Sequence, residues 1–196
     1  MDLTTLDKYM RKSRLKDAYT SITDNYVREK VLAHYAVLVE ENPQDVKMLA
    51  QHMKNAILPA IALRAVLPDS GYTKGETLKL IRNSVLDSAK PMAKVFSKAG
   101  HLPFFFRLFG FMCRKSMFGD NGWIFKWKTC NSTAIEWDCH KCIYHDTFVR
   151  YGFRELTAIF CESDDVMYGN IPGARWGRSK TIGRGAEVCD FCFYKD

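Results

Sequence analysis

The sequence predicts an α+β fold, in which a helical N-terminal region is followed by a small antiparallel sheet with two inserted helices. Three observations support this prediction. Apolar residues recur at helical spacing through the first 120 residues, a period-two alternation starts at Trp123, and two further helical patterns separate that alternation from a C-terminal strand pair. We expect a helical region over residues 1–120 and an α+β region over residues 121–196, packed together as one compact unit.

Capping residues and prolines predict where the helices of the first region begin and end. Asp24 suits an N-cap, and Thr73 with Glu76 forms a capping box. Proline lacks a backbone N–H and its ring clashes with the preceding turn, so we expect Pro59 to kink or break its helix and Pro91 to disturb its own. The helical patterns cover residues 3–10, 24–42, 43–67, 78–90 and 101–118.

The segment 101–118 crowds phenylalanines so closely that a helix there would be apolar almost all round. Such a helix is either buried or covers a ligand cavity. Residues 88–119 also hold six basic residues and no acidic residue, so an interfacial membrane helix and a nucleic-acid surface are alternatives. We favour a solvated basic face and do not expect a nucleic-acid partner, because no nucleic-acid motif accompanies the charge.

Composition excludes several classes of protein. The 196 residues are 47% hydrophobic and 26% charged, which is typical of a globular protein with a core. No apolar run reaches the roughly 20 residues of a membrane helix, and the N-terminus lacks the apolar segment of a signal peptide. Seven cysteines without a secretory signal indicate a reducing compartment. We therefore expect a cytoplasmic protein with no transmembrane segment.

The second region changes from helical to strand periodicity. Aromatic residues alternate with mostly basic ones over residues 123–128, which predicts a strand. Glycines at 152 and 169 are placed to end two helices. The remaining elements are expected as a partner strand over 132–139, helices over 140–152 and 154–169, and a closing hairpin with strands over 174–182 and 186–194.

A basic strip near the C-terminus marks the candidate site. Between residues 165 and 187 the chain has no acidic residue but contains Arg175, Arg178, Lys180, Thr181, Arg184 and Gly185. Cys189 and Asp190 follow shortly after, and Cys161 precedes Asp164 at helical spacing. Basic groups beside thiols and carboxylates predict a small-molecule site that binds an anionic substrate.

Two C-x-x-C pairs, Cys139/Cys142 and Cys189/Cys192, have the spacing of a four-thiolate zinc site. Two features argue against zinc. Cys189 and Cys192 would point to opposite faces of a strand, and the first pair lies at an expected helix start without a glycine-bearing knuckle turn. A redox pair at Cys139/Cys142 lacks the surrounding βαβ pattern. We expect no cofactor, with zinc as the alternative.

A cysteine-dependent hydrolase is the catalytic interpretation. A nucleophilic thiol needs a base or a positively charged surrounding to become a thiolate. Carboxylates beside a thiol raise its pKa, so either the basic strip offsets Asp164 and Asp190, or these carboxylates activate water instead. Cys142, flanked by two histidines, is a third candidate thiol. The sequence leaves the choice between the thiols and water open.

The run from Cys142 to Phe191 resembles the L-2-amino-thiazoline-4-carboxylic acid hydrolase family. The resemblance covers roughly residues 139–193 and includes a C-x-x-D element, an Arg-x-x-Thr element and a C-D-F element. The positions that match the family pattern are Cys142, Gly152, Leu156, Cys161, Asp164, Arg178, Thr181, Gly185, Cys189, Asp190 and Phe191.

The resemblance implies hydrolysis of a cyclic amidine, the thiazoline ring, to a carbamoyl cysteine by attack on a C–N bond. It implies a catalytic role for Cys142, Cys161, Asp164, Cys189 and Asp190. Substrate binding would then fall to Arg175, Arg178, Thr181 and Gly185, with an arginine pairing with the substrate carboxylate. A non-catalytic module that binds small anions and a zinc-linked regulatory protein are the alternatives.

Overall fold

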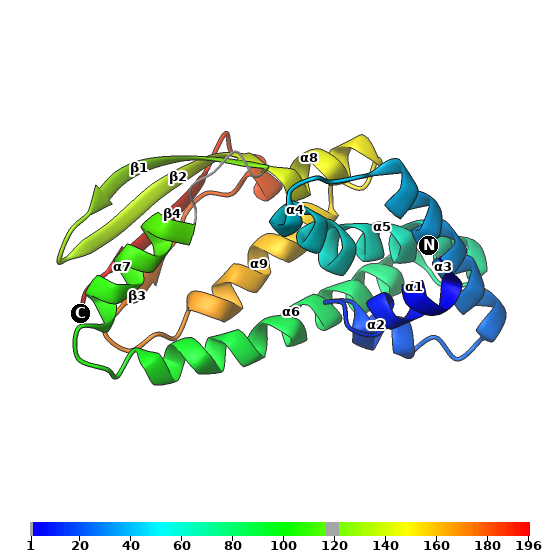
Figure 1. The fold of residues 1–196 in the computed structure, drawn as a ribbon, viewed down its shortest axis with the longest axis horizontal. Helices are drawn as coiled ribbons and strands as arrows, with labels where there is room; N and C mark the ends of the chain where they lie inside the picture. Colours follow the sequence, from blue (N-terminus) through cyan, green and yellow to red (C-terminus); the bar gives the residue numbers. More distant parts are fainter. Residues whose placement is uncertain (1, 117–121) are drawn as a thin grey trace. The chain divides into compact units, whose positions relative to one another are not determined.

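The structure is a computed structural model, and it describes residues 2–116 and 122–196 (Figure 1). The chain forms two compact units. The first comprises Met1–Ser88 and Thr147–Leu156, and the second comprises Ala89–Asp146 and Thr157–Asp196. The boundaries of these two units do not fall at residue 120. The division into regions 1–120 and 121–196 that we expect from the sequence stays a prediction.

The predicted α+β fold is confirmed, because helices occupy the N-terminal side and the strands form one antiparallel sheet of order β1-β2-β4-β3. The helices are α1 (Leu3–Met10), α2 (Lys16–Thr20), α3 (Asn25–Glu41), α4 (Lys47–His52), α5 (Leu58–Val66), α6 (Lys74–Ala99), α7 (Phe105–Ser116), α8 (Ile143–Arg150) and α9 (Leu156–Tyr168). The strands are β1 (Trp123–Cys130), β2 (Ala134–Cys142), β3 (Arg175–Gly177) and β4 (Cys189–Tyr194).

The first unit is built from amphipathic helices whose apolar sides form a core. Leu6 of α1 and Tyr35 of α3 are fully buried there. The predicted N-cap is confirmed, since the Asp24 carboxylate accepts the Tyr26 N–H at 2.8 Å and so satisfies one of the unpaired donors of the first turn of α3.

The helical pattern is interrupted near Pro59, as predicted. A π-helical turn over Met53–Ile57 separates α4 from α5, and Pro59 lies in the first turn of α5. Proline is tolerated at that position because an N–H there would have no partner within the helix.

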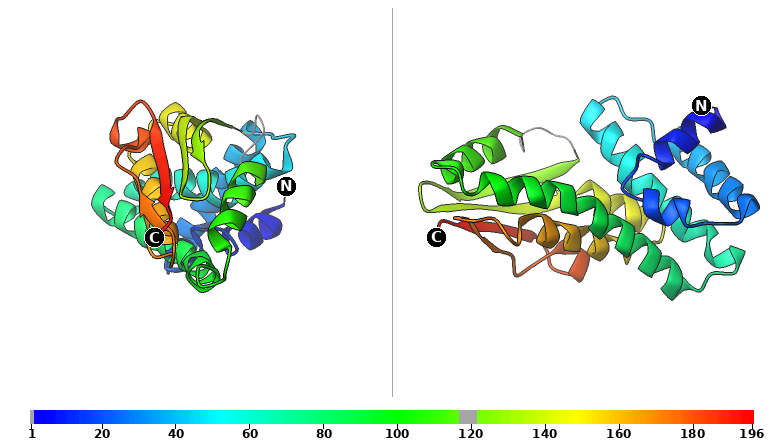
Figure 2. Two further views of the ribbon diagram at one scale, coloured as in Figure 1. Left: turned by 90° about the vertical axis from the view of Figure 1, so that its left-hand side faces the viewer. Right: turned by 90° about the horizontal axis from the view of Figure 1, so that it is seen from below.

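Pro91 does not end its helix, so the predicted disturbance does not take the form of a break. α6 runs unbroken through Pro91 (Figure 2). Its start carries the predicted capping box, in which Thr73 Oγ1 accepts the Glu76 N–H at 3.2 Å and a Glu76 carboxylate oxygen accepts the Thr73 N–H at 2.8 Å. Beyond the proline, the Phe96 ring packs edge-on against that of Phe109, so tertiary contacts offset the missing hydrogen bond.

β2 is longer than its sequence pattern predicts. The alternation in β1 and the antiparallel partner are confirmed, but β2 extends to Cys142, which pairs with Trp123. The expected helix start at His140 is therefore wrong, and α8 begins at Ile143. Lys141 and Cys142 pair with β1, and this pairing keeps the end of β2 extended. Pairing with a distant strand cannot be predicted from the local periodicity of the sequence.

The C-terminal strands pair antiparallel, which confirms the closing hairpin. β3 spans only Arg175–Gly177, and Gly177 pairs with Cys192 of β4. A 3₁₀ turn over Ile182–Arg184 occupies part of the connection, where the sequence predicts a strand reaching residue 182.

One face of the sheet, called the inner face here, carries the apolar side chains. Cross-strand pairs set it up by joining Ile135 to Phe193, Trp137 to Phe191, and Cys139 to Cys189. α7 covers this face with the buried side chains of Phe105, Phe106 and Phe109, which share one cluster with Ile135, Trp137 and Phe193.

The outer side of α7 is not buried, so the expectation of a helix enclosed all round holds only for its inner side. Leu108, Phe111 and Met112 are exposed there. Residues 117 and 118 of the expected helix lie outside the described residues. Among the described residues, none of the helices combines the length and the apolar composition that crossing a bilayer requires.

Replacing Pro91 with alanine should stabilise the protein. Alanine restores the missing backbone donor inside α6, and we expect the free energy of unfolding to rise by about 2 kcal/mol after allowance for the more flexible unfolded chain. Urea denaturation measures the change. Pro68→Ala is the control, because Pro68 starts a 3₁₀ turn and removes no helical hydrogen bond. An unchanged or lower midpoint for Pro91→Ala would contradict the prediction.

Candidate active site

α9 places a thiol and two carboxylates on one helix. Cys161 precedes Asp164 by three residues and Asp165 by four, so the three side chains lie on neighbouring positions of one side. All three are partly exposed, while Ser163 between them is buried and donates to the Phe160 carbonyl at 2.7 Å. The helical spacing predicted from the sequence is confirmed.

Arg178 binds this group of residues from the segment after β3. Its Nη1 donates to Asp164 Oδ2 at 2.9 Å, and its Nη2 donates to Asp165 Oδ1 at 2.7 Å and to the Cys161 carbonyl at 2.6 Å. The Arg178 side chain is only 2% exposed. Burial by itself would lower the pKa of Arg178, but the two carboxylates raise it above its ordinary value.

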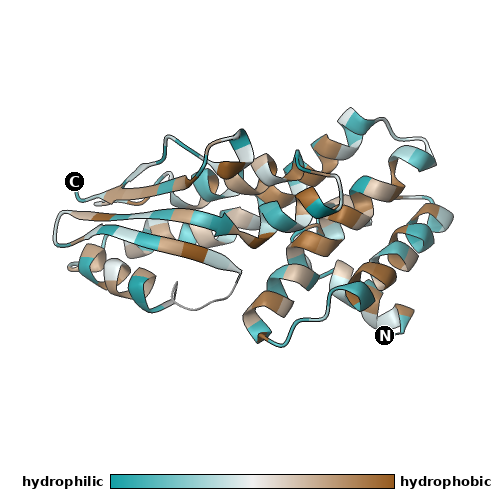
Figure 3. Ribbon diagram, turned by 90° about the horizontal axis from the view of Figure 1, so that it is seen from above, coloured by the Kyte–Doolittle hydropathy of each residue, from teal (hydrophilic) through white to brown (hydrophobic). Residues whose placement is uncertain are grey.

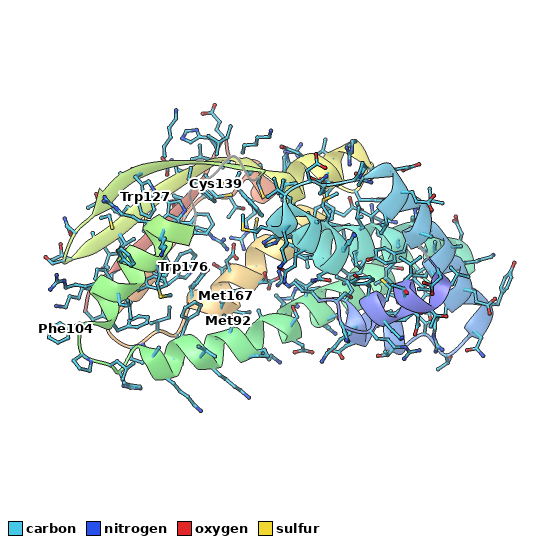
Figure 4. All side chains as sticks on the ribbon, in the orientation of Figure 1. Met92, Phe104, Trp127, Cys139, Met167 and Trp176 are labelled. Atoms are coloured by element: carbon cyan, nitrogen blue, oxygen red, sulfur yellow. The ribbon has the colours of Figure 1, made fainter. Side chains whose placement is uncertain are left out.

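Aromatic rings enclose the guanidinium. It lies 5.4 Å from the ring centre of Trp176 and 5.7 Å from that of Phe191 on the inner face. Trp176, labelled in Figure 4, also donates its Nε1–H to Asp165 Oδ1 at 3.0 Å. The cation is therefore held between α9 and the sheet by charge, hydrogen bonds and cation–π contacts together.

The turn from Thr181 to Gly185 closes over the thiol of α9. Thr181 is buried, and its Oγ1 accepts the Arg184 N–H at 3.2 Å. A Cβ on Gly183 would lie 3.0 Å from Cys161 Sγ and 3.0 Å from the Ala158 nitrogen, so a glycine is needed for this approach. Gly185 adopts φ +94 at the end of the turn, a conformation that favours glycine.

The thiols of Cys161 and Cys189 are hydrogen-bonded to each other. A hydrogen bond from Cys189 lowers the pKa of Cys161 to about 7, and Arg178 and Thr181 add to this effect, against burial and Asp164. The same hydrogen bond and burial raise the pKa of Cys189 far above its ordinary value. The Ile182 N–H donates to Cys189 Sγ at 3.2 Å. The contact between the two thiols therefore lowers the pKa of Cys161 and raises that of Cys189.

Two further thiols lie within electrostatic range of this pair. Burial raises the pKa of Cys142 to about 11, although the backbone N–H groups of His145 and Tyr144 act in the opposite direction. Burial likewise raises the pKa of Cys139, which is labelled in Figure 4, well above its usual range. Of these four thiols, Cys161 is the one whose pKa lies below its ordinary value.

Asp190 and Arg175 lie apart from these thiols. Side chains alternate along a strand, so Asp190 projects from the face of β4 opposite to Cys189. There its carboxylate accepts the backbone N–H groups of Ser179 and Lys180, which lower its pKa despite the opposing effect of burial. Arg175 pairs with the far end of β4, about 17 Å along the strand from Cys189.

The described residues, 2–116 and 122–196, include no group of three or more His, Cys, Asp or Glu side chains arranged to hold a metal ion. Cys192 lies on the face of β4 opposite to Cys189, as the strand alternation predicts, and this separates the second C-x-x-C pair. The alternative of zinc at these four cysteines therefore gains no geometric support.

Three contributors to the site are absent from the residues selected on sequence. Asp165 shares Arg178 with Asp164, Trp176 anchors Asp165, and Gly183 lets the turn reach Cys161. Asp165 could have been selected, because it lies one turn beyond Cys161 in the helical pattern. Gly183 belongs to the glycine-rich part of the basic strip, but its close approach to Cys161 depends on tertiary contacts. Trp176 had no local signal, since its role depends on contacts between α9 and the chain after β3.

A cavity of about 380 Å³ lies elsewhere, in the first unit. Leu6, Val39 and Met53 contribute its apolar lining, and Glu40 and Lys54 contribute charged groups. The lining of this cavity includes no cysteine, so the cavity and the thiols of the candidate site belong to different parts of the chain.

Comparison with known families identifies the family of most of the chain. A model of the family described as L-2-amino-thiazoline-4-carboxylic acid hydrolase matches residues 50–193, which is more than half of the chain and includes the thiol pair, Arg178 and the closing turn. No curated protein and no solved structure matches the chain.

Replacing Gly183 with alanine should push the closing turn away from α9. The added methyl group would meet backbone atoms as well as Cys161 Sγ, and we expect a loss of about 1–3 kcal/mol in the free energy of unfolding. Gly75→Ala is the matched control, because a Cβ there meets nothing within 4 Å. Equal stability of the two variants in urea denaturation would contradict the close approach.

The alkylation rate of Cys161 should rise with pH through a midpoint near 7, because the thiolate is the reacting form. Iodoacetamide labelling followed by mass spectrometry of each cysteine peptide measures it. Cys189→Ala removes the hydrogen bond and should move the midpoint upward, whereas Cys192→Ala should leave it unchanged. A midpoint at the ordinary value of 9.0 in the unaltered protein would refute the hydrogen-bonded pair.

Proposed function

The chain belongs to the L-2-amino-thiazoline-4-carboxylic acid hydrolase family, and on that premise we propose that it hydrolyses a cyclic amidine that carries a carboxylate. The family's description supports a hydrolase. One arrangement of the site supports the finer proposal: the partly exposed Cys161 lies one helical turn from Asp164 on α9, and the closing turn approaches its sulfur at Gly183.

We assign the nucleophile to Cys161. Its thiolate would add to the amidine carbon, whose π electrons move to nitrogen, and collapse of this adduct would break one ring bond of that carbon. Cys189, protonated and hydrogen-bonded to Cys161, is placed to give a proton to the departing ring atom. Water would then attack the same carbon and release Cys161 as the thiolate, and the proton that this water loses would return to Cys189, so one water molecule is consumed per turnover.

Asp164 is proposed to position and activate that water. It lies one helical turn from Cys161 and is partly exposed. Arg178 keeps Asp164 oriented through its 2.9 Å hydrogen bond and partly neutralises the charge that would otherwise oppose the thiolate. The expected binding of the substrate carboxylate by Arg178 or Arg175 stays a prediction.

Thr181 and the backbone of the closing turn are proposed to stabilise the charge that develops on the substrate. Thr181 acts on Cys161 through its hydroxyl group, and the Ile182 N–H points at the sulfur of Cys189, so both groups face the reacting atoms. Gly185 allows the chain to turn back there. Fixed donors of this kind stabilise an adduct without rearranging during the reaction.

Cys161→Ala should reduce turnover of 2-amino-thiazoline-4-carboxylate by at least about a thousand-fold, because the nucleophile is lost. Liquid chromatography with mass spectrometry measures ring opening. Cys192→Ala is the matched control, since Cys192 lies on the opposite face of β4. Cys142→Ala and Asp190→Asn test the other residues that the family pattern implies.

The products identify the bond that breaks. Cleavage of the carbon–nitrogen bond leaves an S-carbamoyl product without a free thiol, whereas cleavage of the carbon–sulfur bond leaves an N-carbamoyl product with one, which a thiol reagent detects. Full activity of Cys161→Ala together with an inactive Asp164→Asn would replace the thiolate mechanism by water activation. A thermal shift with the substrate and no turnover would support a binding module instead.

A further inference from the structure

The outer side of α7, with the segment before it, exposes an unusual amount of apolar surface. Its large apolar side chains are between 45% and 77% exposed. We call it the α7 outer surface, and its apolar members are Leu102, Phe104, Leu108, Phe111 and Met112. All belong to the second unit. Apolar residues that cluster on one surface usually mark an interaction site.

Basic residues are interleaved with this apolar surface. Arg107 and Arg114 lie two turns apart along one edge of the helix, where the exposed Arg114 also lies 5.6 Å from the ring centre of Trp127. Lys115 lies between Leu108 and Phe111 on the exposed side. Figure 3 shows hydrophilic and hydrophobic residues interspersed along α7. Residues 88–119 contain no acidic side chain, so this stretch of chain supplies only positive charge.

Phe104 holds a conformation that a bulky residue rarely adopts. Its φ is 64°, it is 77% exposed, and its carbonyl accepts the Leu108 N–H at 3.1 Å at the start of α7. Figure 4 shows Phe104 pointing away from the helices and strands of its unit. A left-handed conformation costs a phenylalanine free energy, and such strained residues cluster at functional sites.

We propose that the α7 outer surface binds peripherally to a lipid bilayer with anionic headgroups. Phe104, Leu108 and Phe111 would enter the boundary between headgroups and acyl chains, and Arg107, Arg114 and Lys115 would contact the headgroup phosphates and carboxylates. A helix of 12 residues, about 18 Å long, suits an orientation in the plane of the interface and cannot span the bilayer.

Two other partners fit the surface less well. A second copy of the chain, related by a twofold axis, would bring like basic charges together across the contact. A nucleic acid would use the basic groups for its phosphates and leave the exposed phenylalanines and leucines without a role. An anionic bilayer uses both kinds of side chain. The inference is independent of the hydrolysis proposed above.

Co-sedimentation of the full chain with vesicles tests the proposal. We expect binding to vesicles of phosphatidylcholine and phosphatidylserine in equal parts, at least about ten-fold tighter than to phosphatidylcholine alone, because several basic groups each add attraction to an anionic surface. Leu108→Ser with Phe111→Ser should abolish binding. Both side chains are exposed, so the fold should persist, and circular dichroism checks this.

A matched control removes exposed apolar side chains elsewhere. Tyr26→Ser with Val37→Ser on α3 alters residues of similar exposure in the first unit and should bind like the unaltered protein. Arg107→Gln with Lys115→Gln should weaken binding to the anionic vesicles by about ten-fold or more and leave thermal stability unchanged.

Phe104→Gly separates a binding role from a structural one. Glycine adopts φ near +64 without strain, so the variant should unfold at a higher temperature while binding the anionic vesicles more weakly. If Phe104 served only the fold, its replacement would not raise the unfolding temperature and at the same time weaken vesicle binding.

Several results would overturn the proposal. One is the absence of vesicle binding by the unaltered chain, and another is full binding by the Leu108→Ser, Phe111→Ser variant, which would reduce the effect to non-specific charge attraction. A concentration-dependent dimer that this variant disrupts, in a protein that ignores vesicles, would show that a second copy covers the surface.

Discussion

The buried guanidinium of Arg178 is the interaction on which the candidate site depends. It joins the segment after β3 to α9 by binding two carboxylates and the carbonyl of Cys161, under the rings of Trp176 and Phe191. Removing one partner of a buried ion pair leaves an uncompensated charge, which typically costs about 3–5 kcal/mol. The orientation of α9 toward the sheet, and therefore the position of its thiol, follows from this cluster.

The chemistry of the thiols follows from that position. With α9 held against the sheet, Cys161 meets Cys189 of the inner face, and the closing turn can approach because Gly183 has no side chain. Four cysteines share this part of the protein, yet burial keeps the pKa of Cys139 and Cys142 high, and hydrogen bonding lowers the pKa of Cys161 alone. Selectivity among the thiols is thus a product of their surroundings and not of the C-x-x-C spacing.

The two sides of α7 have different roles. Its inner residues complete the aromatic core over the sheet, which also supports Phe191 beneath Arg178. Its outer residues retain apolar bulk that the core does not use, interleaved with positive charge. The crowding of phenylalanines that predicts complete burial is therefore shared between packing and a surface that we assign to an anionic bilayer.

The sequence by itself determined the features that local forces set. Helical periodicity, the caps at Asp24 and Thr73, the alternation in β1, the one-turn spacing of Cys161 and Asp164, and the family resemblance were all readable, because each depends on residues close along the chain or on a spaced pattern. Only the tertiary structure decided the rest. Pairing of Lys141 and Cys142 with β1 kept the end of β2 extended, packing carried α6 through Pro91, and the fold brought Arg178 to the carboxylates of α9. These outcomes depend on partners distant in sequence, whose contact energies exceed local preferences.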